Sequence, residues 1–231
     1  MCLKSVFYQL ATHRKRLDLS HLRQEYSNQK LDVDSVEACP FDQFELWFDQ
    51  AKRSELCEPN AMALATVDSD GRPSIRTVLL KYLDRQGFVF FTNYQSRKAM
   101  HLERNQNVSL LFQWLPLSRQ VEISGTATKI SKSESLQYFL KRPYGSQLGA
   151  WVSTQSQVIS ARSLLEEKLA ELKRKFAEGS VPLPSFWGGY RIRPRRFEFW
   201  QGGPSRLHDR IEYLPADKDE QAGWSRNRLS P

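Results

Sequence analysis

The spacing of apolar residues changes along this chain, and each change predicts a different element. In Pro40–Lys52 the Phe and Trp residues recur every three or four positions, which is typical of a helix with one buried face. From Ala61 onward the period falls to two, which indicates strands. The helical period returns between Ser160 and Phe176, where a leucine stripe predicts another helix.

Short polar turns separate the predicted strands. Asp68-Ser69-Asp70-Gly71 and Asp84-Arg85-Gln86-Gly87 are sequences typical of hairpin turns. The expected strands are Ala61–Val67, Ser74–Tyr82, Phe88–Thr92, Val108–Trp114, Gln120–Lys129, Tyr190–Ile192, Phe197–Trp200 and Arg210–Tyr213, with a last short segment from Trp224. Consecutive hairpins with helices between them predict an antiparallel α+β fold, most simply a closed barrel.

Three shorter helices are expected beside these strands. Ser96 is placed to cap a helix that reaches Asn105. Ser131-Lys132-Ser133-Glu134 has the spacing of a capping box, and the helix that it opens should end at Arg142, because Pro143 cannot continue it. The third is a short helix over Asp18–Tyr26.

Length and composition bound the class of protein. The chain has 231 residues, of which 40% are hydrophobic and 26% charged, as in a folded protein rather than a disordered one. No apolar run reaches the roughly 18 residues of a membrane helix. No repeat or long linker interrupts residues 18–231, so we expect one domain there. Residues 1–17 are rich in Lys and Arg, and we expect a disordered basic tail.

The charge of the chain indicates the class of its partners, and its cysteine content indicates the compartment. Lys and Arg number 34 against 26 Asp and Glu, for a formal charge of +8. This excess indicates an anionic partner without choosing between nucleic acid, a membrane surface and a phosphorylated small molecule. Three widely spaced cysteines form no disulfide framework and favour a reducing, cytoplasmic compartment. The four histidines lack the spacing of a zinc site, so we expect no metal.

Basic side chains are the candidates for binding a phosphate, because the sequence has no glycine-rich phosphate loop. Arg76 and Lys81 interrupt an apolar strand with no acid nearby. Five positions apart, they lie on opposite faces of a regular strand, so a common site requires a bulge, a strand end or a subunit interface. Arg97 and Lys98 follow Ser96 at a helix start, where a bound phosphate would relieve their conflict with the helix dipole.

A second candidate phosphate site involves a helix and the residues after it. Tyr138 and Arg142 lie four residues apart, hence on one face of the helix, and Ser146 follows just beyond it. A phenol, a guanidinium and a hydroxyl can together clamp a phosphate. Ordinary surface positions often carry the same residue types. The pattern alone therefore does not distinguish a phosphate site from unrelated surface residues.

The segment from Glu198 to Arg210 is the densest in functional side chains. Alternation places Arg206, His208 and Arg210 on one side of an extended run, and Trp200 offers a flat face for a planar ring. The separate basic run Arg191–Arg196 is typical of a solvated strand edge, with a nucleic-acid contact as the alternative.

From about Leu19 to Pro231 the chain resembles the pyridoxine/pyridoxamine 5′-phosphate oxidase family. The resemblance is carried by Ser20-His21-Leu22-Arg23-Gln24-Glu25-Tyr26, the Arg76–Lys81 strand, Phe91-Thr92-Asn93, Ser96-Arg97-Lys98, Arg119-Gln120-Val121, Ser146-Gln147, Trp187-Gly188-Gly189, Trp200, Arg206-Leu207-His208-Asp209-Arg210 and Arg228-Leu229-Ser230-Pro231. The sequence departs from the family pattern at Glu122, where relatives often carry a basic or apolar residue, and at Ser230, which replaces an alanine.

The resemblance implies a fold and an activity. The fold would be the antiparallel FMN-binding split β-barrel with flanking helices, assembled as a homodimer with FMN at the subunit interface. The activity would be oxidation of pyridoxine or pyridoxamine 5′-phosphate by O2 to pyridoxal 5′-phosphate, with H2O2 and, from the amine, NH3, in vitamin B6 biosynthesis or salvage. The substrate would be a small phosphorylated pyridine, and neither nucleic acid nor a membrane would be a partner.

The resemblance also implies roles for individual residues. The FMN contacts would be Arg76, Thr77, Val78, Leu79, Leu80, Lys81, Phe91, Thr92, Arg97, Lys98, Gln120, Gln155, Ser156, Trp200 and Arg210. The substrate contacts would be Arg23, Gln24, Glu25, Tyr26, Lys81, Tyr138, Arg142, Ser146, Arg206, Leu207 and His208. Arg206 and His208 would be the catalytic residues, chiefly by orienting the substrate, and proton transfer by His208 is a hypothesis.

Other functions remain open from the sequence alone. A split-barrel flavin reductase or oxidase with another substrate would share most of the same residues. A flavin-binding protein without catalysis would share the cofactor contacts. A basic nucleic-acid-binding module would use Arg191–Arg196, and its affinity would fall steeply with salt.

Overall fold

The computed structural model describes residues 19, 26, 30–177, 179–216 and 223–231. The expected tail, residues 1–17, lies outside this range, and so does most of the helix expected over Asp18–Tyr26. Among the described residues, no helix is both long and apolar enough to cross a membrane.

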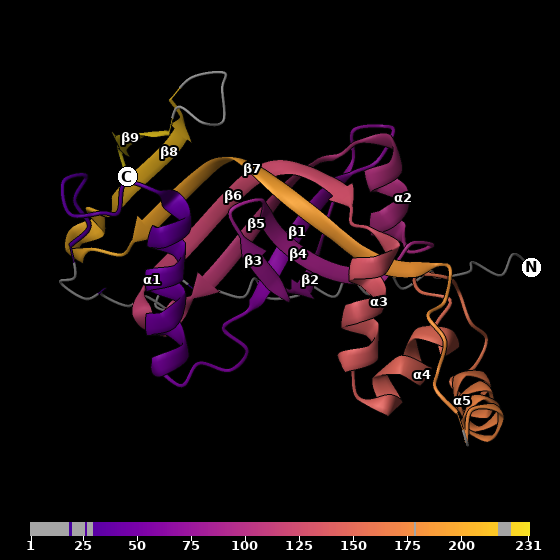
Figure 1. Cartoon of the computed structure of the whole chain (residues 1–231). Helices are drawn as coiled ribbons and strands as arrows, with labels where there is room; N and C mark the ends of the chain where they lie inside the picture. The colour runs from indigo at the N-terminus through magenta and orange to yellow at the C-terminus, as the bar shows by residue number, and fades with distance from the viewer. Residues whose placement is uncertain (1–18, 20–25, 27–29, 178, 217–222) are drawn as a thin grey trace, which may run out of the picture.

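An antiparallel sheet of nine strands forms the body of the described chain (Figure 1). The strands are β1 Ala61–Val67, β2 Pro73–Leu79, β3 Tyr82–Asp84, β4 Gly87–Asn93, β5 Asn107–Trp114, β6 Arg119–Lys129, β7 Trp187–Gln201, β8 Asp209–Pro215 and β9 Trp224–Leu229. Their order is β2-β1-β5-β6-β7-β4-β3, with β8 paired to β7 and β9 paired to β8. Among the described residues, the edge strands β2 and β3 pair only with β1 and β4. The sheet is therefore a curled half-barrel, as in a split barrel, and the expectation of a closed barrel was wrong.

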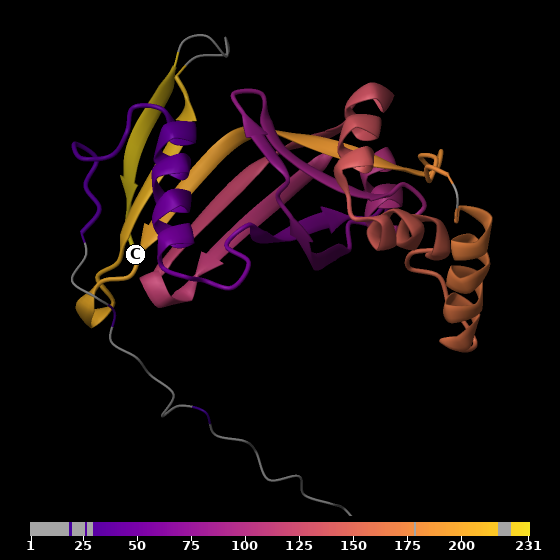
Figure 2. The ribbon, with the colours of Figure 1, turned by 60° about the horizontal axis from the view of Figure 1, so that its bottom comes forward.

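Five helices flank the described sheet. They are α1 Pro40–Arg53, α2 Arg97–Arg104, α3 Lys132–Lys141, α4 Tyr144–Val152 and α5 Ser163–Lys175. Helix α1 lies beside β8 and β9 at one end of the sheet, and α3, α4 and α5 gather at the other end (Figure 2). The two ends are joined by the long strand β7.

The main core lies between α1 and the sheet. Phe44 of α1 is fully buried and packs edge-on against Phe88, with ring centroids 5.0 Å apart, and against Phe112, at 4.9 Å. Aromatic pairs of this kind add to the stabilisation that burial provides. The helix predicted from the Phe and Trp period is therefore confirmed, together with its buried face.

The small helices form a second core and contain one element that the sequence analysis missed. The capping box at Ser131 is confirmed, since Glu134 N–H donates to the serine hydroxyl and the Glu134 carboxylate accepts from Ser131 N–H. Helix α4 was not predicted, because nine residues directly after Pro143 are too few to establish a period. Helix α5 begins at Ser163 rather than Ser160, and of its leucine stripe only Leu172 is buried.

Two predicted strand boundaries were wrong. The expected strand Ser74–Tyr82 is two strands, because the chain changes partner after Leu80: the N–H of Leu80 still donates to Asn60 O, next to β1, whereas that of Lys81 donates to Val89 O of β4. Conversely, β7 is one strand where two were expected. It continues through Pro194 at a shift in register opposite β6, where the missing N–H of proline is tolerated.

Candidate functional site

A cavity of about 770 Å³ lies where β2 and β4 meet the start of α2 and the helices α3 and α4. It is lined by five cations and, among the described residues, by no carboxylate. The predicted site residues that line it are Arg76, Thr77, Val78, Leu79, Lys81, Phe91, Thr92, Arg97, Lys98, Tyr138, Arg142, Ser146, Gln155 and Ser156. The change of strand partner after Leu80 allows Arg76 and Lys81 to share this cavity, which a regular strand would forbid.

Arg76 is held by neutral acceptors only, in the part of the chain that the structure describes. Its guanidinium donates to Leu64 O at 2.9 Å, to Thr66 Oγ1 at 2.7 Å and to Ser74 Oγ at 2.7 Å. Thr66 is fully buried and also contacts His101 Nδ1 at 3.1 Å. Burial, and then the charge of Arg97, lower the pKa of Arg76. The guanidinium is therefore oriented but not neutralised, which suits an anionic ligand.

Lys98 is buried and also lacks an acidic partner among the described residues. Its ammonium group donates to Gln155 Oε1 at 3.0 Å, Thr92 Oγ1 at 3.1 Å and Ser96 Oγ at 3.3 Å. Ser96 therefore occupies the N-cap position of α2 without capping it by its side chain. Burial, followed by the charge of Arg76, lowers the pKa of Lys98 to about 8.

Arg142 has a buried donor that no described group accepts. Its guanidinium lies 4.6 Å from the centre of the Trp187 ring, and Nη1 is buried without a hydrogen-bond partner. Leaving a buried donor unsatisfied costs about 1–3 kcal/mol. Tyr138, one helical turn earlier, stacks on Phe91 with ring centroids 3.9 Å apart. An anion in the cavity would satisfy the unpaired nitrogen.

We expect the affinity of this cavity for sulfate to fall as the pH rises through about 8. Lys98 loses its proton there, whereas the charge of sulfate does not change. With one proton linked to binding, the affinity should fall by up to about tenfold per pH unit above that point. Isothermal titration between pH 6.5 and 9.5 would measure it. The Lys98→Met protein should bind more weakly with a flat profile, and an equally steep profile in that variant would contradict the assignment.

A second group of predicted residues lies around Trp200. The His208 ring lies 4.7 Å from that of Trp200, and Tyr26 packs edge-on against both, at 5.6 Å from Trp200 and 5.4 Å from His208. The backbone N–H of Gly203 donates to His208 Nδ1 at 3.2 Å. The neutral imidazole therefore carries its proton on Nε2.

Arg206 lies on a tight turn next to this group. Ser205 and Arg206 both adopt left-handed backbone conformations, with φ of 54° and 62°, which costs of order 1–3 kcal/mol per residue. A Cβ on Gly203 would lie 2.3 Å from Leu207 O, so the turn requires glycine there. Leu207 is exposed.

One chain does not bring the two groups of predicted residues together. Trp187, which lines the cavity, begins β7, whereas Trp200 is its penultimate residue. At about 3.3 Å per residue, these positions lie roughly 40 Å apart along the strand. The predicted residues that do not line the cavity are Tyr26, Leu80, Gln120, Trp200, Arg206, Leu207, His208 and Arg210. The predicted contacts Arg23, Gln24 and Glu25 lie outside the described residues.

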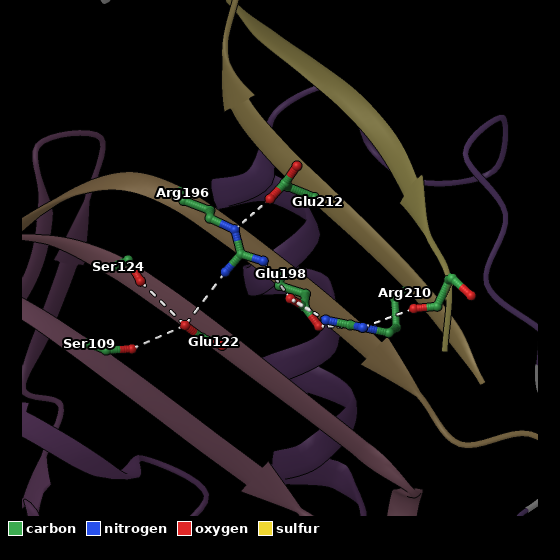
Figure 3. Close-up of polar contacts among 8 residues, drawn as sticks. Ser109, Glu122, Ser124, Arg196, Glu198, Arg210 and Glu212 are labelled. Carbon is green, nitrogen blue, oxygen red and sulfur yellow. Dashed lines mark hydrogen bonds and ion pairs between the residues drawn. The ribbon is translucent and has the colours of Figure 1, made fainter. Parts of the chain in front are cut away.

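Ion pairs that sequence reasoning missed explain part of the basic run Arg191–Arg196. Arg191 pairs with Asp84 and Glu134. Arg196 and Arg210 both pair with Glu198, on the same face of the sheet (Figure 3). A solvated edge was thus the wrong interpretation for Arg191 and Arg196, and their engaged guanidinium groups weaken the nucleic-acid alternative. No local pattern predicts the pairs of Arg191, because Asp84 and Glu134 are 107 and 57 residues away from it in the sequence.

Comparisons with known proteins agree in both halves of the chain. Residues 48–176 match the family described as pyridoxamine 5′-phosphate oxidase, and residues 187–231 match the pyridoxine 5′-phosphate oxidase C-terminal dimerisation region. Curated proteins named pyridoxine/pyridoxamine 5′-phosphate oxidase from Crocosphaera subtropica and Aliarcobacter butzleri are 62% and 57% identical. Each alignment covers 93% of this chain and 100% of the relative.

Solved structures agree on the fold. The structure of PhzG from Burkholderia lata, in complex with tetrahydrophenazine-1-carboxylic acid, superposes with a TM-score of 0.82 at 31% identity, and covers 89% of this chain and 100% of that one. A pyridoxamine 5′-phosphate oxidase-related, FMN-binding protein from Nostoc punctiforme has a TM-score of 0.65 at 17% identity, covering 85% of this chain and 100% of that one. At that identity the second comparison supports the fold alone.

Proposed function

Because this chain belongs to the pyridoxine/pyridoxamine 5′-phosphate oxidase family, we propose that it oxidises pyridoxine 5′-phosphate and pyridoxamine 5′-phosphate to pyridoxal 5′-phosphate. The alcohol and O2 give the aldehyde and H2O2. The amine additionally takes up water and releases NH3. The observation that carries the proposal is the cavity with five cations and no carboxylate among its described lining residues, in a chain so similar to oxidases of phosphorylated substrates.

We propose FMN as the cofactor, on the chemistry of the lining residues. FMN and the substrate would bring two phosphate dianions to one site, which matches the uncompensated cations Arg76, Lys98 and Arg142. When bound, FMN would supply the redox chemistry of the reaction, as acceptor of a hydride from the substrate and donor of electrons to O2. The protein contributes binding, orientation and the exclusion of water.

In this proposal the polar residues of the cavity form two sets, one for each phosphate. Arg76, Arg97, Lys98 and Ser156, near the start of α2, would hold the phosphate of FMN. Lys81, Tyr138, Arg142 and Ser146 would hold the phosphate of the substrate. Arg142 is the sharpest candidate in the second set, because its buried Nη1 has no other partner among the described residues.

The group around Trp200 would complete the cavity of a second copy of the chain. Trp200, Arg206, His208 and Arg210 all fall within the segment that matches a dimerisation region. Because they lie far from the cavity of their own chain, a homodimer with composite sites offers them a role that a monomer does not. Residues 23–26, of which only Tyr26 is described, would then cover the same site.

In the proposed site His208 acts as a hydrogen-bond donor. Its Nδ1 accepts the N–H of Gly203, so the neutral ring presents Nε2–H to the substrate. Arg206 offers a planar guanidinium with five donors and no acceptor, so its role would be to bind and orient rather than to act as a base. Both residues would hold the substrate ring in place beside the flavin.

The proposal is tested by the visible spectrum of the purified protein and by turnover in air. We expect flavin absorbance and, on addition of pyridoxine 5′-phosphate, aldehyde and H2O2 in equal amounts. Pyridoxine without its phosphate is the matched control and should react far more slowly. A colourless protein would contradict the proposal, and a yellow protein that leaves pyridoxine 5′-phosphate unchanged would point to another substrate or to flavin binding without catalysis.

A further inference from the structure

Three glutamates stand in one row across the sheet. Glu122 of β6 lies directly opposite Glu198 of β7, which lies directly opposite Glu212 of β8. The Glu198 side chain is only 7% exposed. Like charges opposite each other on neighbouring strands are destabilising, so the row requires compensating cations.

Arg196 compensates all three glutamates at once (Figure 3). Its guanidinium lies 2.5 Å from Glu212 Oε1, 2.5 Å from Glu198 Oε2 and 3.5 Å from Glu122 Oε1. Burial alone would favour the neutral acid, but the hydrogen bonds and charges of Arg210 and Arg196 keep the pKa of Glu198 below its usual value. Glu198 is therefore a carboxylate at neutral pH.

Arg210 completes the network from the next strand. Its Nε and Nη2 donate to the two oxygens of Glu198, at 2.8 and 3.1 Å, and its Nη1 donates to Ser230 O at 2.9 Å. A guanidinium has five N–H groups, so two remain, one on each terminal nitrogen. Three carboxylates against two guanidiniums leave the network with no excess positive charge.

This arrangement is the electrostatic opposite of the cavity. There, Arg76, Lys98 and Arg142 lack an acidic partner among the described residues, as suits a phosphate. Here, the charge of Arg210 is cancelled by Glu198, so its free N–H groups suit an uncharged acceptor. Arg210 also lies directly opposite Trp200, whose flat face can carry a planar ring.

We propose that Glu198 is a positioning residue for flavin binding, which fixes the plane of Arg210 and cancels its charge so that Arg210 recognises the uncharged ring of the flavin and not a phosphate. The inference rests on the proposed function, which assigns Trp200 and Arg210 to the cofactor. It divides recognition of FMN in two: phosphate at the cavity cations, and ring at the pair formed by Glu198 and Arg210.

Binding of FMN and of riboflavin, which has the same ring but no phosphate, separates the two parts. The full-length protein, stripped of flavin, is titrated with each by fluorescence quenching. We expect Glu198→Gln to weaken both ligands by about the same factor, roughly tenfold, as for loss of one well-placed polar contact. Arg97→Ala, at the cavity, should weaken FMN by at least that factor and leave riboflavin within about twofold.

The matched control is Glu212→Gln, which also removes a carboxylate from Arg196 but leaves the pair of Glu198 with Arg210. We expect both affinities to stay within about twofold. Because Glu198 acts through Arg210, Glu198→Gln should have no further effect in an Arg210→Gln background. If Glu198→Gln does not fold, Glu198→Asp takes its place, keeping the charge but misplacing it, and should again weaken both ligands equally.

Besides unchanged binding of both flavins in Glu198→Gln, three results would overturn the inference. They are a loss confined to FMN in Glu198→Gln, an equal loss in Glu212→Gln, and additive effects of the Glu198 and Arg210 changes. Failure of the proposed cofactor is distinct, since the unmodified protein would then bind neither flavin, and failure of the proposed reaction is distinct, since it would leave flavin binding by the unmodified protein intact. A protein that binds both flavins tightly with Glu198→Gln in place would refute only the role of Glu198.

Discussion

Arg142→Ala and Arg206→Ala proteins are each expected to lose at least about 30-fold in kcat/KM, because removing one partner of a charged contact to a buried ligand costs about 2–5 kcal/mol. Arg142 should act mainly through binding of the substrate phosphate, so KM should rise far more than FMN affinity falls. In Arg206→Ala, FMN should remain bound while turnover drops. Steady-state kinetics with pyridoxine 5′-phosphate give kcat and KM for each protein, and its flavin content shows how much FMN it retains. Equal loss of FMN and substrate binding in Arg142→Ala would mean that the two phosphate positions have been merged wrongly.

Mixed dimers of these two variants should regain activity, and this is the sharpest consequence of a composite site. In a mixed dimer one cavity keeps Arg142 and receives the intact Arg206 of the other chain, whereas the second site has lost both. Random assembly makes half of the dimers mixed, so about one quarter of the unmodified activity should return. Refolding each variant alone is the control and should restore nothing. No recovery in dimers shown to be mixed, by two affinity tags, would place each site within one chain.

Arg196→Leu is expected to destabilise the protein by about 3–5 kcal/mol, the usual cost of removing one partner from a buried ion pair. Of the three glutamates opposite each other on β6, β7 and β8, only Glu198 would then keep an ion pair among the described residues, with Arg210. The midpoint of thermal unfolding should fall by roughly 10 °C for a chain of this size. Differential scanning calorimetry or urea unfolding at pH 7 measures the change.

The neighbouring Arg195 provides the control, since it is exposed on the same strand. Arg195→Leu should change the free energy of unfolding by no more than about 0.5 kcal/mol. Adding Glu212→Gln to Arg196→Leu should recover part of the loss, because one of the opposed charges is removed. Similar losses in Arg195→Leu and Arg196→Leu would show that hydrophobic exposure, and not the unpaired carboxylates, is responsible.

Elements whose signals lie within a few residues were predictable. The aromatic period of α1, the capping box at Ser131 and the turn Asp68–Gly71 depend on neighbours along the chain, and the structure confirms each. Helix α4 was not predictable, because a nine-residue helix after a proline has too few turns to show a period. The break expected between Ile192 and Phe197 was wrong, since the register shift at which β7 continues through Pro194 involves β6, about 70 residues earlier in the chain.

By itself, the sequence determined which cations lack a nearby acid, which segments carry the family resemblance and where most strands and helices lie. Only the tertiary structure decided which of those cations share a cavity. Arg76 and Lys81 share the cavity because the chain changes strand partner after Leu80, and Arg210 is neutralised because the register of β7 and β8 brings Glu198 beside it. These outcomes depend on pairing between distant strands and on the curl of the sheet, which no local pattern encodes.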